Sequence, residues 1–187
     1  MKYAAFLRGI NVGGNALVKM TDLKRLMEAT GFKEVKTLLA SGNVVFDAPR
    51  GDAKKIATKI EAVLKKKYMR DIAVIVLSID DLKKLDATQP FKGIKVTPET
   101  PLESRKRPLT GQARLYVTFL YEKPKSHLKL APSKVFYLTK KSDTAICSVL
   151  ILTPDRSTID LMAALEKHYG KLVTTRNWNT VQKILKA

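Results

Sequence analysis

The chain has 187 residues, 45% of them hydrophobic and 28% charged, so it is long enough to bury a core in one domain or two small lobes and should fold unaided. Its 35 Lys and Arg residues against 17 Asp and Glu residues give a formal net charge of +18, which favours phosphate-bearing partners, although lysines spread over a surface for solubility explain the charge about as well. The one cysteine, Cys147, excludes an internal disulfide and a multi-cysteine zinc site.

The apolar runs of the sequence are short. The N-terminal run from Tyr3 to Leu7 is too short for a signal-peptide core and is followed by Arg8. No run approaches the ~20 residues that a membrane span requires. We therefore expect a cytoplasmic protein with no membrane partner, while the oligomeric state stays open.

The first half predicts the order strand, helix, strand, strand, helix, strand. A strand over 2–7 leads to a helix with Thr21 as its N-cap and Gly31 just past its end. Strands over 35–40 and 44–46 are joined by a Ser-Gly-Asn turn, and a helix from Asp52 precedes a strand over 72–77. This order over residues 1–78 predicts an α+β, ferredoxin-like sandwich with its helices on one face of an antiparallel sheet.

The second half predicts a related lobe. A capping box at Ser78 and Asp81 predicts the start of a short helix. Four prolines within 90–111 then indicate an irregular segment. We therefore expect residues 79–111 to connect two domains, at 1–78 and 112–187. Strands are predicted over 114–120, 135–139 and 144–152, with a brief helix near 126–130 and another opened by the Ser157 to Asp160 box. The β-α-β-β-α order echoes the first half and precedes a C-terminal helix.

Three segments carry a family resemblance. They read Phe-Leu-Arg-Gly-Ile-Asn-Val-Gly-Gly at 6–14, Leu-Ala-Ser-Gly-Asn-Val-Val-Phe at 39–46, and Thr-Arg-Asn-Trp-Asn-Thr-Val at 175–181. In this order they resemble the DUF1697 family, a bacterial domain of unknown function, over essentially the whole chain. The resemblance implies a two-lobed α+β protein with a ferredoxin-like first lobe, and it implies no established activity or catalytic residues.

Nucleotide and metal motifs are incomplete. The loop at 9–14 has the glycine spacing of a P-loop, but Asn15 and Ala16 stand where Lys and Ser or Thr are required, and the dinucleotide fingerprint is absent. His127 and His168 are far apart, with no second ligand at metal-binding spacing. We predict neither a metal nor a cofactor.

Catalytic residues are not predicted either. Cys147 lies in an apolar strand and is expected to be a buried, inert thiol. Ser41 lies in a turn rather than in a nucleophile elbow. Whether the protein is an enzyme stays open, because folding could still bring Asp47, Asp52 or His168 beside a substrate.

Two groups of residues are candidate sites. A polar group from three loops could hold a phosphate or carboxylate in a cleft between the lobes, through Arg forks and backbone N–H groups, although turn formation and helix capping also explain each member. Its residues are Arg8, Asn11, Gly13, Gly14, Ser41, Asn43, Arg176 and Asn177. A basic group is the candidate nucleic-acid site: Lys65, Lys66, Lys67, Arg70, Arg105, Lys106 and Arg107.

Three functions follow from these groups. Non-specific binding of a phosphate-bearing partner such as nucleic acid is favoured by the charge, although the aromatic signature of an RNA-reading sheet is absent. An enzyme or receptor for a small anionic metabolite is the first alternative. A structural or protein-interaction domain is the second.

Overall fold

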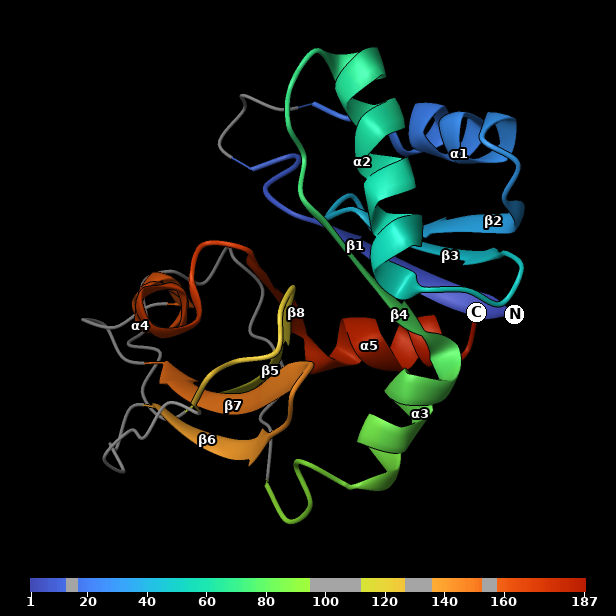
Figure 1. The fold of residues 1–187 in the computed structure, drawn as a ribbon. Coiled ribbons are helices and arrows are strands. Elements are labelled where there is room, and N and C mark those ends of the chain that lie inside the picture. The colour runs from blue at the N-terminus through green and yellow to red at the C-terminus, as the bar shows by residue number, and fades with distance from the viewer. Residues whose placement is uncertain (13–16, 95–111, 127–135, 153–157) are drawn as a thin grey trace. The chain divides into compact units, whose positions relative to one another are not determined.

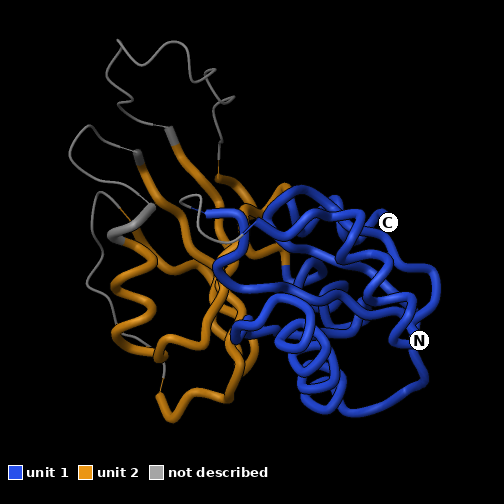
Figure 2. Tube along the Cα trace, turned by 90° about the horizontal axis from the view of Figure 1, so that it is seen from above, with its two compact units in different colours: residues 1–88, 180–187 blue, residues 89–179 orange. Residues whose placement is uncertain are grey.

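The chain forms two compact units in the computed structural model, which describes residues 1–12, 17–94, 112–126, 136–152 and 158–187 (Figure 1). Unit 1 consists of residues 1–88 and 180–187, and unit 2 of residues 89–179 (Figure 2). The chain passes from unit 1 to unit 2 after Thr88 and returns after Asn179, so unit 1 is built from two separate segments.

Unit 1 contains a four-stranded antiparallel sheet in the order β2-β3-β1-β4. The strands are β1 (Lys2–Leu7), β2 (Lys33–Leu38), β3 (Asn43–Asp47) and β4 (Val74–Ser78). Helix α1 (Met20–Ala29) connects β1 to β2, and α2 (Ala53–Tyr68) connects β3 to β4. The predicted β-α-β-β-α-β order is confirmed, and the strand order is that of a ferredoxin-like sandwich.

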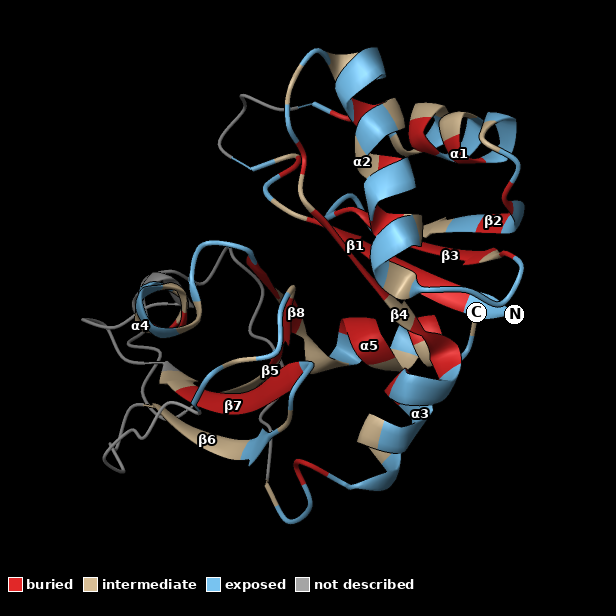
Figure 3. Ribbon diagram, viewed as in Figure 1, coloured by how far each residue is buried: buried red, intermediate tan, exposed pale blue. Residues whose placement is uncertain are grey.

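Helices cover both faces of this sheet (Figure 3). Tyr3, Ala5 and Leu7 alternate towards α1 and α2 and join their apolar stripes in one core. Ala4 and Phe6 point to the opposite face and are also buried, on the side of α3 (Ile79–Ala87) and α5 (Trp178–Leu185). The two helices of residues 1–78 lie on one face as predicted, and the second face is covered by α3 and α5, which come from outside that segment.

Local capping explains where two of these helices begin. Asp52 precedes α2 and accepts a hydrogen bond from the Lys54 amide at 2.8 Å. At the start of α3, Ser78 Oγ accepts from the Asp81 amide at 3.0 Å and donates to Asp81 Oδ2 at 2.6 Å, as the capping box predicted.

Helix α1 begins differently from the prediction. It starts at Met20, one residue before the predicted N-cap Thr21, and Lys19 at the N-cap position provides no side-chain cap. The chain entering this helix is fixed instead by Asn11, whose Oδ1 accepts from the Val18 amide at 2.7 Å. The Val18 amide precedes the helix, so this bond orients the incoming chain and does not cap α1.

Unit 2 repeats the strand arrangement of unit 1. Its strands are β5 (Gln112–Leu120), β6 (Phe136–Lys141), β7 (Ala145–Leu152) and β8 (Val173–Asn177), with α4 (Thr158–Tyr169) before β8. They form an antiparallel sheet in the order β6-β7-β5-β8, so in both units the first strand lies between the third and the fourth. The echo seen in the sequence is therefore present in the fold, while the helix predicted near 126–130 falls mostly outside the described residues.

One element of unit 2 was not predicted. Residues 175–177 were expected to be a loop before the last helix, but they belong to β8 (173–177), which pairs with β5, where Val117 lies opposite Arg176. β-Branched Val173, Thr174 and Thr175 suit a strand, and pairing with a distant strand decides the outcome. No helix within the described residues is both long and apolar enough to cross a bilayer.

Candidate functional site

The structure brings three of the predicted polar residues together in unit 1. Asn11 Nδ2 donates to Ala40 O at 2.7 Å and to Val18 O at 3.0 Å, which ties the loop after β1 to the turn between β2 and β3. Asn43 is fully buried, and its Nδ2 donates to Leu38 O at 2.9 Å and to Ser41 Oγ at 3.0 Å. These bonds hold the turn and the neighbouring loop in one arrangement.

The turn itself depends on Gly42. This residue has φ +76°, and a Cβ placed on it would lie 2.6 Å from Ile10 Cδ1 and 2.9 Å from Leu7 Cβ. Its carbonyl accepts from the Leu7 amide at 2.8 Å. Glycine thus meets two requirements at this position, a left-handed backbone and close contact with the loop that follows β1.

Arg8 lies at the end of β1, next to this turn. Its side chain is half-buried, and its backbone amide donates to Ala73 O at 2.9 Å in the loop before β4. Gly13 and Gly14, predicted to belong to the same polar group, lie outside the described residues.

Arg176 and Asn177 belong to unit 2. Arg176 is 9% exposed, and its Nη1 donates to Thr174 Oγ1 at 2.7 Å and to Thr175 O at 3.0 Å. Burial lowers the pKa of its guanidinium to about 10, so the group stays charged at neutral pH in a poorly hydrated place. Asn177 Oδ1 accepts from the Asn179 amide at 2.9 Å and caps α5.

Helix α2 carries most of the predicted basic group that the structure describes. Six lysines lie on it, all exposed: Lys54, Lys55, Lys59, Lys65, Lys66 and Lys67. Lys65 pairs with Asp71 at 2.9 Å, and Lys59 lies 5.1 Å from the centre of the Phe32 ring. Arg70 follows this helix and is half-buried, whereas Arg105, Lys106 and Arg107 lie outside the described residues.

The acidic side chain of α2 points towards β4. Glu61 is the sole acidic residue between the two ends of α2, and its Oε1 accepts from the Val74 amide at 2.8 Å. Its carboxylate is thereby anchored to β4. The exposed lysines of α2 lie towards its two ends, at 54–59 and 65–67.

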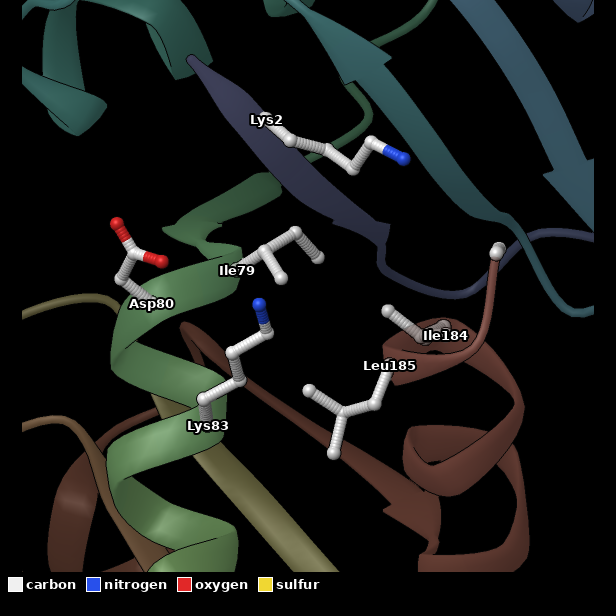
Figure 4. A pocket seen from close by; sticks show the side chains of 7 residues that line it. Lys2, Ile79, Asp80, Lys83, Ile184 and Leu185 are labelled. Atoms are coloured by element: carbon white, nitrogen blue, oxygen red, sulfur yellow. The ribbon is translucent and has the colours of Figure 1, made fainter.

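A separate pocket of unit 1 has a volume of about 240 Å³ (Figure 4). It is lined by residues from β1, α3 and the end of α5: Lys2, Ile79, Asp80, Lys83, Ile184, Leu185 and Ala187. The ammonium group of Lys83 points towards Ile79, whereas the carboxylate of Asp80 points away from the centre. The pocket is smaller than the roughly 300–1,000 Å³ of sites for drug-sized ligands, so its size suits only a small molecule.

The remaining candidates were the thiol and the histidines. Cys147 is fully buried on β7, as expected, and burial raises the pKa of its thiol to about 12. His168 Nε2 lies 3.2 Å from Ser126 O, and His127 falls outside the described residues. Within the described parts of the chain, no three acidic, His or Cys side chains gather where they could hold a metal.

Comparison with known proteins places the chain in a family. A family model described as a protein of unknown function, DUF1697, matches residues 1–132, which is more than half of the chain. The chain belongs to the DUF1697 family. No curated protein matches it. This DUF1697 chain is similar to the solved structure of a conserved bacterial protein, SP0830 from Streptococcus pneumoniae, with a TM-score of 0.62 and 19% sequence identity, over 99% of this chain and 97% of that one. At this identity the likeness shows the fold alone.

The pocket of this DUF1697 protein was not predicted from the sequence, for a physical reason. Lys2, Lys83 and Leu185 come from three segments with no shared motif, and they meet only because α5 returns to the sheet of unit 1. The amphipathic pattern of the last helix was visible, but the sequence did not say which surface its apolar side would cover.

Proposed function

We propose that this protein binds phosphate-bearing polymers such as nucleic acid, without sequence preference, through the lysine-rich outer face of α2. The observation that carries the proposal is the imbalance on this helix, where six exposed lysines stand against a single carboxylate that is bonded to the Val74 amide. The net charge of +18 adds a long-range attraction for polyanions.

The dimensions of the helix fit this role. Its 16 residues extend over roughly 24 Å at ~1.5 Å per residue, a length along which duplex DNA carries about 14 charges at one per ~1.7 Å. Lys54 and Lys55 lie in the first turn, and Lys66 and Lys67 in the last. These two pairs can therefore contact phosphates at separate points of one backbone.

The expected binding is to the backbone rather than to bases. In unit 1 both sheet faces carry helices, so the sheet next to α2 offers no open face on which bases could stack. Contacts to phosphate fix position and carry no sequence information directly. Affinity should then depend strongly on salt and weakly on sequence.

Fluorescence anisotropy with labelled single-stranded and duplex oligonucleotides, titrated at several salt concentrations, tests the proposal. The helix variant is the fourfold substitution of Lys54, Lys55, Lys66 and Lys67 by Ala, which keeps good helix formers in α2. The matched control removes the same charge from exposed positions of unit 2 by replacing Lys125, Lys140, Lys141 and Lys171 with Ala. Both variants have the same net charge.

If all four helix lysines touch phosphates, the helix variant should lower the slope of log affinity against log salt by up to ~3.6 for duplex and ~2.8 for single strands. The control variant should keep the wild-type slope. No binding at low salt, or an equal loss in the two variants, would reject the proposal and leave the charge as a solubility feature.

A further inference from the structure

Three loops meet at one end of the unit 1 sheet, which we call the loop end. They are the described residues 8–12 and 17–19 after β1, the turn 39–42 between β2 and β3, and residues 69–73 before β4. Backbone bonds join them, because Leu7 N donates to Gly42 O at 2.8 Å and Arg8 N to Ala73 O at 2.9 Å. The described parts of these loops are thus fixed next to one another.

Each of the three loops of the loop end carries exposed apolar side chains. Of the six large hydrophobic residues that are exposed in the described part of the chain, four belong to these loops. Their exposed fractions are 71% for Val12, 76% for Leu17, 49% for Leu39 and 86% for Met69. Single exposed hydrophobics are ordinary, but a group at one end of a sheet indicates a contact surface.

The backbone at Leu39 supports the same conclusion. Leu39 has φ 59°, the left-handed region that Gly or Asn adopts at lower cost, and its exposed side chain buries no apolar surface that would offset this cost. Met69 has φ 54° for a local reason, because it ends α2 and its amide donates to Lys65 O at 2.8 Å. An exposed aliphatic side chain at a strained position such as Leu39 is expected where that side chain makes a functional contact.

The charges around the apolar residues decide the partner. Six basic residues lie in or beside these loops: Arg8, Lys19, Lys65, Lys66, Lys67 and Arg70. The acidic residues there are Asp22, in the first turn of α1, and Asp71, which pairs with Lys65 at 2.9 Å. Aliphatic side chains beside an excess of cations fit an interface of anionic lipid headgroups and acyl chains.

We propose that the loop end docks on membrane surfaces that contain anionic lipid, with Leu39 and Met69 inserted at the headgroup level. This mode needs no membrane-spanning segment. This surface could not be predicted from the sequence, because its four apolar residues lie far apart along the chain. The short apolar runs of the sequence had instead argued against a membrane partner. Lys65, Lys66 and Lys67 belong both to the loop end and to the outer face of α2, but phosphate polymers offer the aliphatic side chains no matching contact, so Leu39 and Met69 should matter for lipid binding alone.

Co-sedimentation with vesicles tests the docking, using phosphatidylcholine alone and with about one-third phosphatidylserine. The double variant Leu39→Asn with Met69→Asn removes the apolar side chains while keeping residues that tolerate a left-handed backbone, so the fold should persist. The matched control is Leu172→Asn, which changes an exposed leucine of unit 2. A charge variant combines Lys66→Ala and Lys67→Ala.

Wild type should bind the anionic vesicles and leave neutral ones unbound. The double variant should bind at least about tenfold more weakly and keep its oligonucleotide affinity, and each lysine removed should cost about fivefold. The Leu172→Asn control should match wild type. No binding to anionic vesicles, or binding that only the charge variant weakens, overturns the proposal.

Insertion can be observed directly with an environment-sensitive dye. Attached to Met69→Cys, the dye should shift to the blue when anionic vesicles are added, and attached to Leu172→Cys it should not. The native Cys147 is buried and should not compete for the label. An unchanged spectrum at position 69 despite sedimentation would refute insertion.

Discussion

Replacing Gly42 by Ala should destabilise unit 1 more than the same replacement at any open loop glycine. The new Cβ would lie 2.6 Å from Ile10 Cδ1 and 2.9 Å from Leu7 Cβ, and Leu7 belongs to the central strand and cannot move away cheaply. A left-handed backbone costs a non-glycine residue about 1–2 kcal/mol. Overpacking adds about 1–3 kcal/mol, so the free energy of unfolding should fall by about 2–5 kcal/mol.

Gly9→Ala provides the matched control in the same region. Gly9 also has a positive φ, +64°, but no atom lies within 4 Å of its added Cβ, so only the backbone cost of about 1–2 kcal/mol should appear. Urea unfolding followed by circular dichroism measures both variants, and hydrogen exchange of the Leu7 amide reports the opening of unit 1 itself. Equal destabilisation by the two substitutions would refute the close-contact argument.

Three further predictions concern other parts of the chain. Asn11→Ala should lower the free energy of unfolding by about 2–3 kcal/mol in urea titrations, because it leaves Val18 and Ala40 without their side-chain partner. Asn11→Asp keeps the acceptor for the Val18 amide and should therefore lower it less. A thiol reagent should label Cys147 slowly in the native protein and fast in urea, and fast native labelling would contradict the burial. Between pH 9 and about 12 the free energy of unfolding of the wild type should fall relative to that of Cys147→Ala by up to ~1.4 kcal/mol per pH unit, because the unfolded thiol ionises there before the folded one. A difference between the two proteins that stays constant over this range would refute the shifted pKa. Replacing Arg105, Lys106 and Arg107 by Ala should lower the salt slope of oligonucleotide affinity by up to roughly 2–3 in anisotropy titrations if all three touch phosphate, and an unchanged slope would exclude them from the interface.

Local chemistry explains why much of unit 1 could be predicted. Asp52 caps α2, and Ser78 with Asp81 caps α3, through atoms within three residues of each other. The same holds for the turn around Gly42, where a glycine followed by an asparagine indicates a tight reversal. Signals of this kind are contained in a few consecutive residues.

Features that depend on partners far away in the chain could not be predicted from the sequence. β8 was taken for a loop because its strand character comes from pairing with β5, and Arg176 is buried only as part of that sheet. In the candidate site, Asn11 was correctly singled out as a loop residue, but its bond to Ala40 spans 29 positions. That bond gives the side chain a role in joining loops, which spacing alone does not reveal.

The discontinuity of unit 1 has a consequence for protein synthesis. Residues 180–187 complete this unit only after the ribosome has made residues 89–179, which takes about 5–20 s at ~5–20 residues per second. Val181 and Ile184 are buried in the finished protein, so during this interval the nascent unit lacks two of its apolar side chains and keeps part of the sheet face around Ala4 and Phe6 exposed. The nascent chain should therefore be a chaperone client that is released when its last helix emerges.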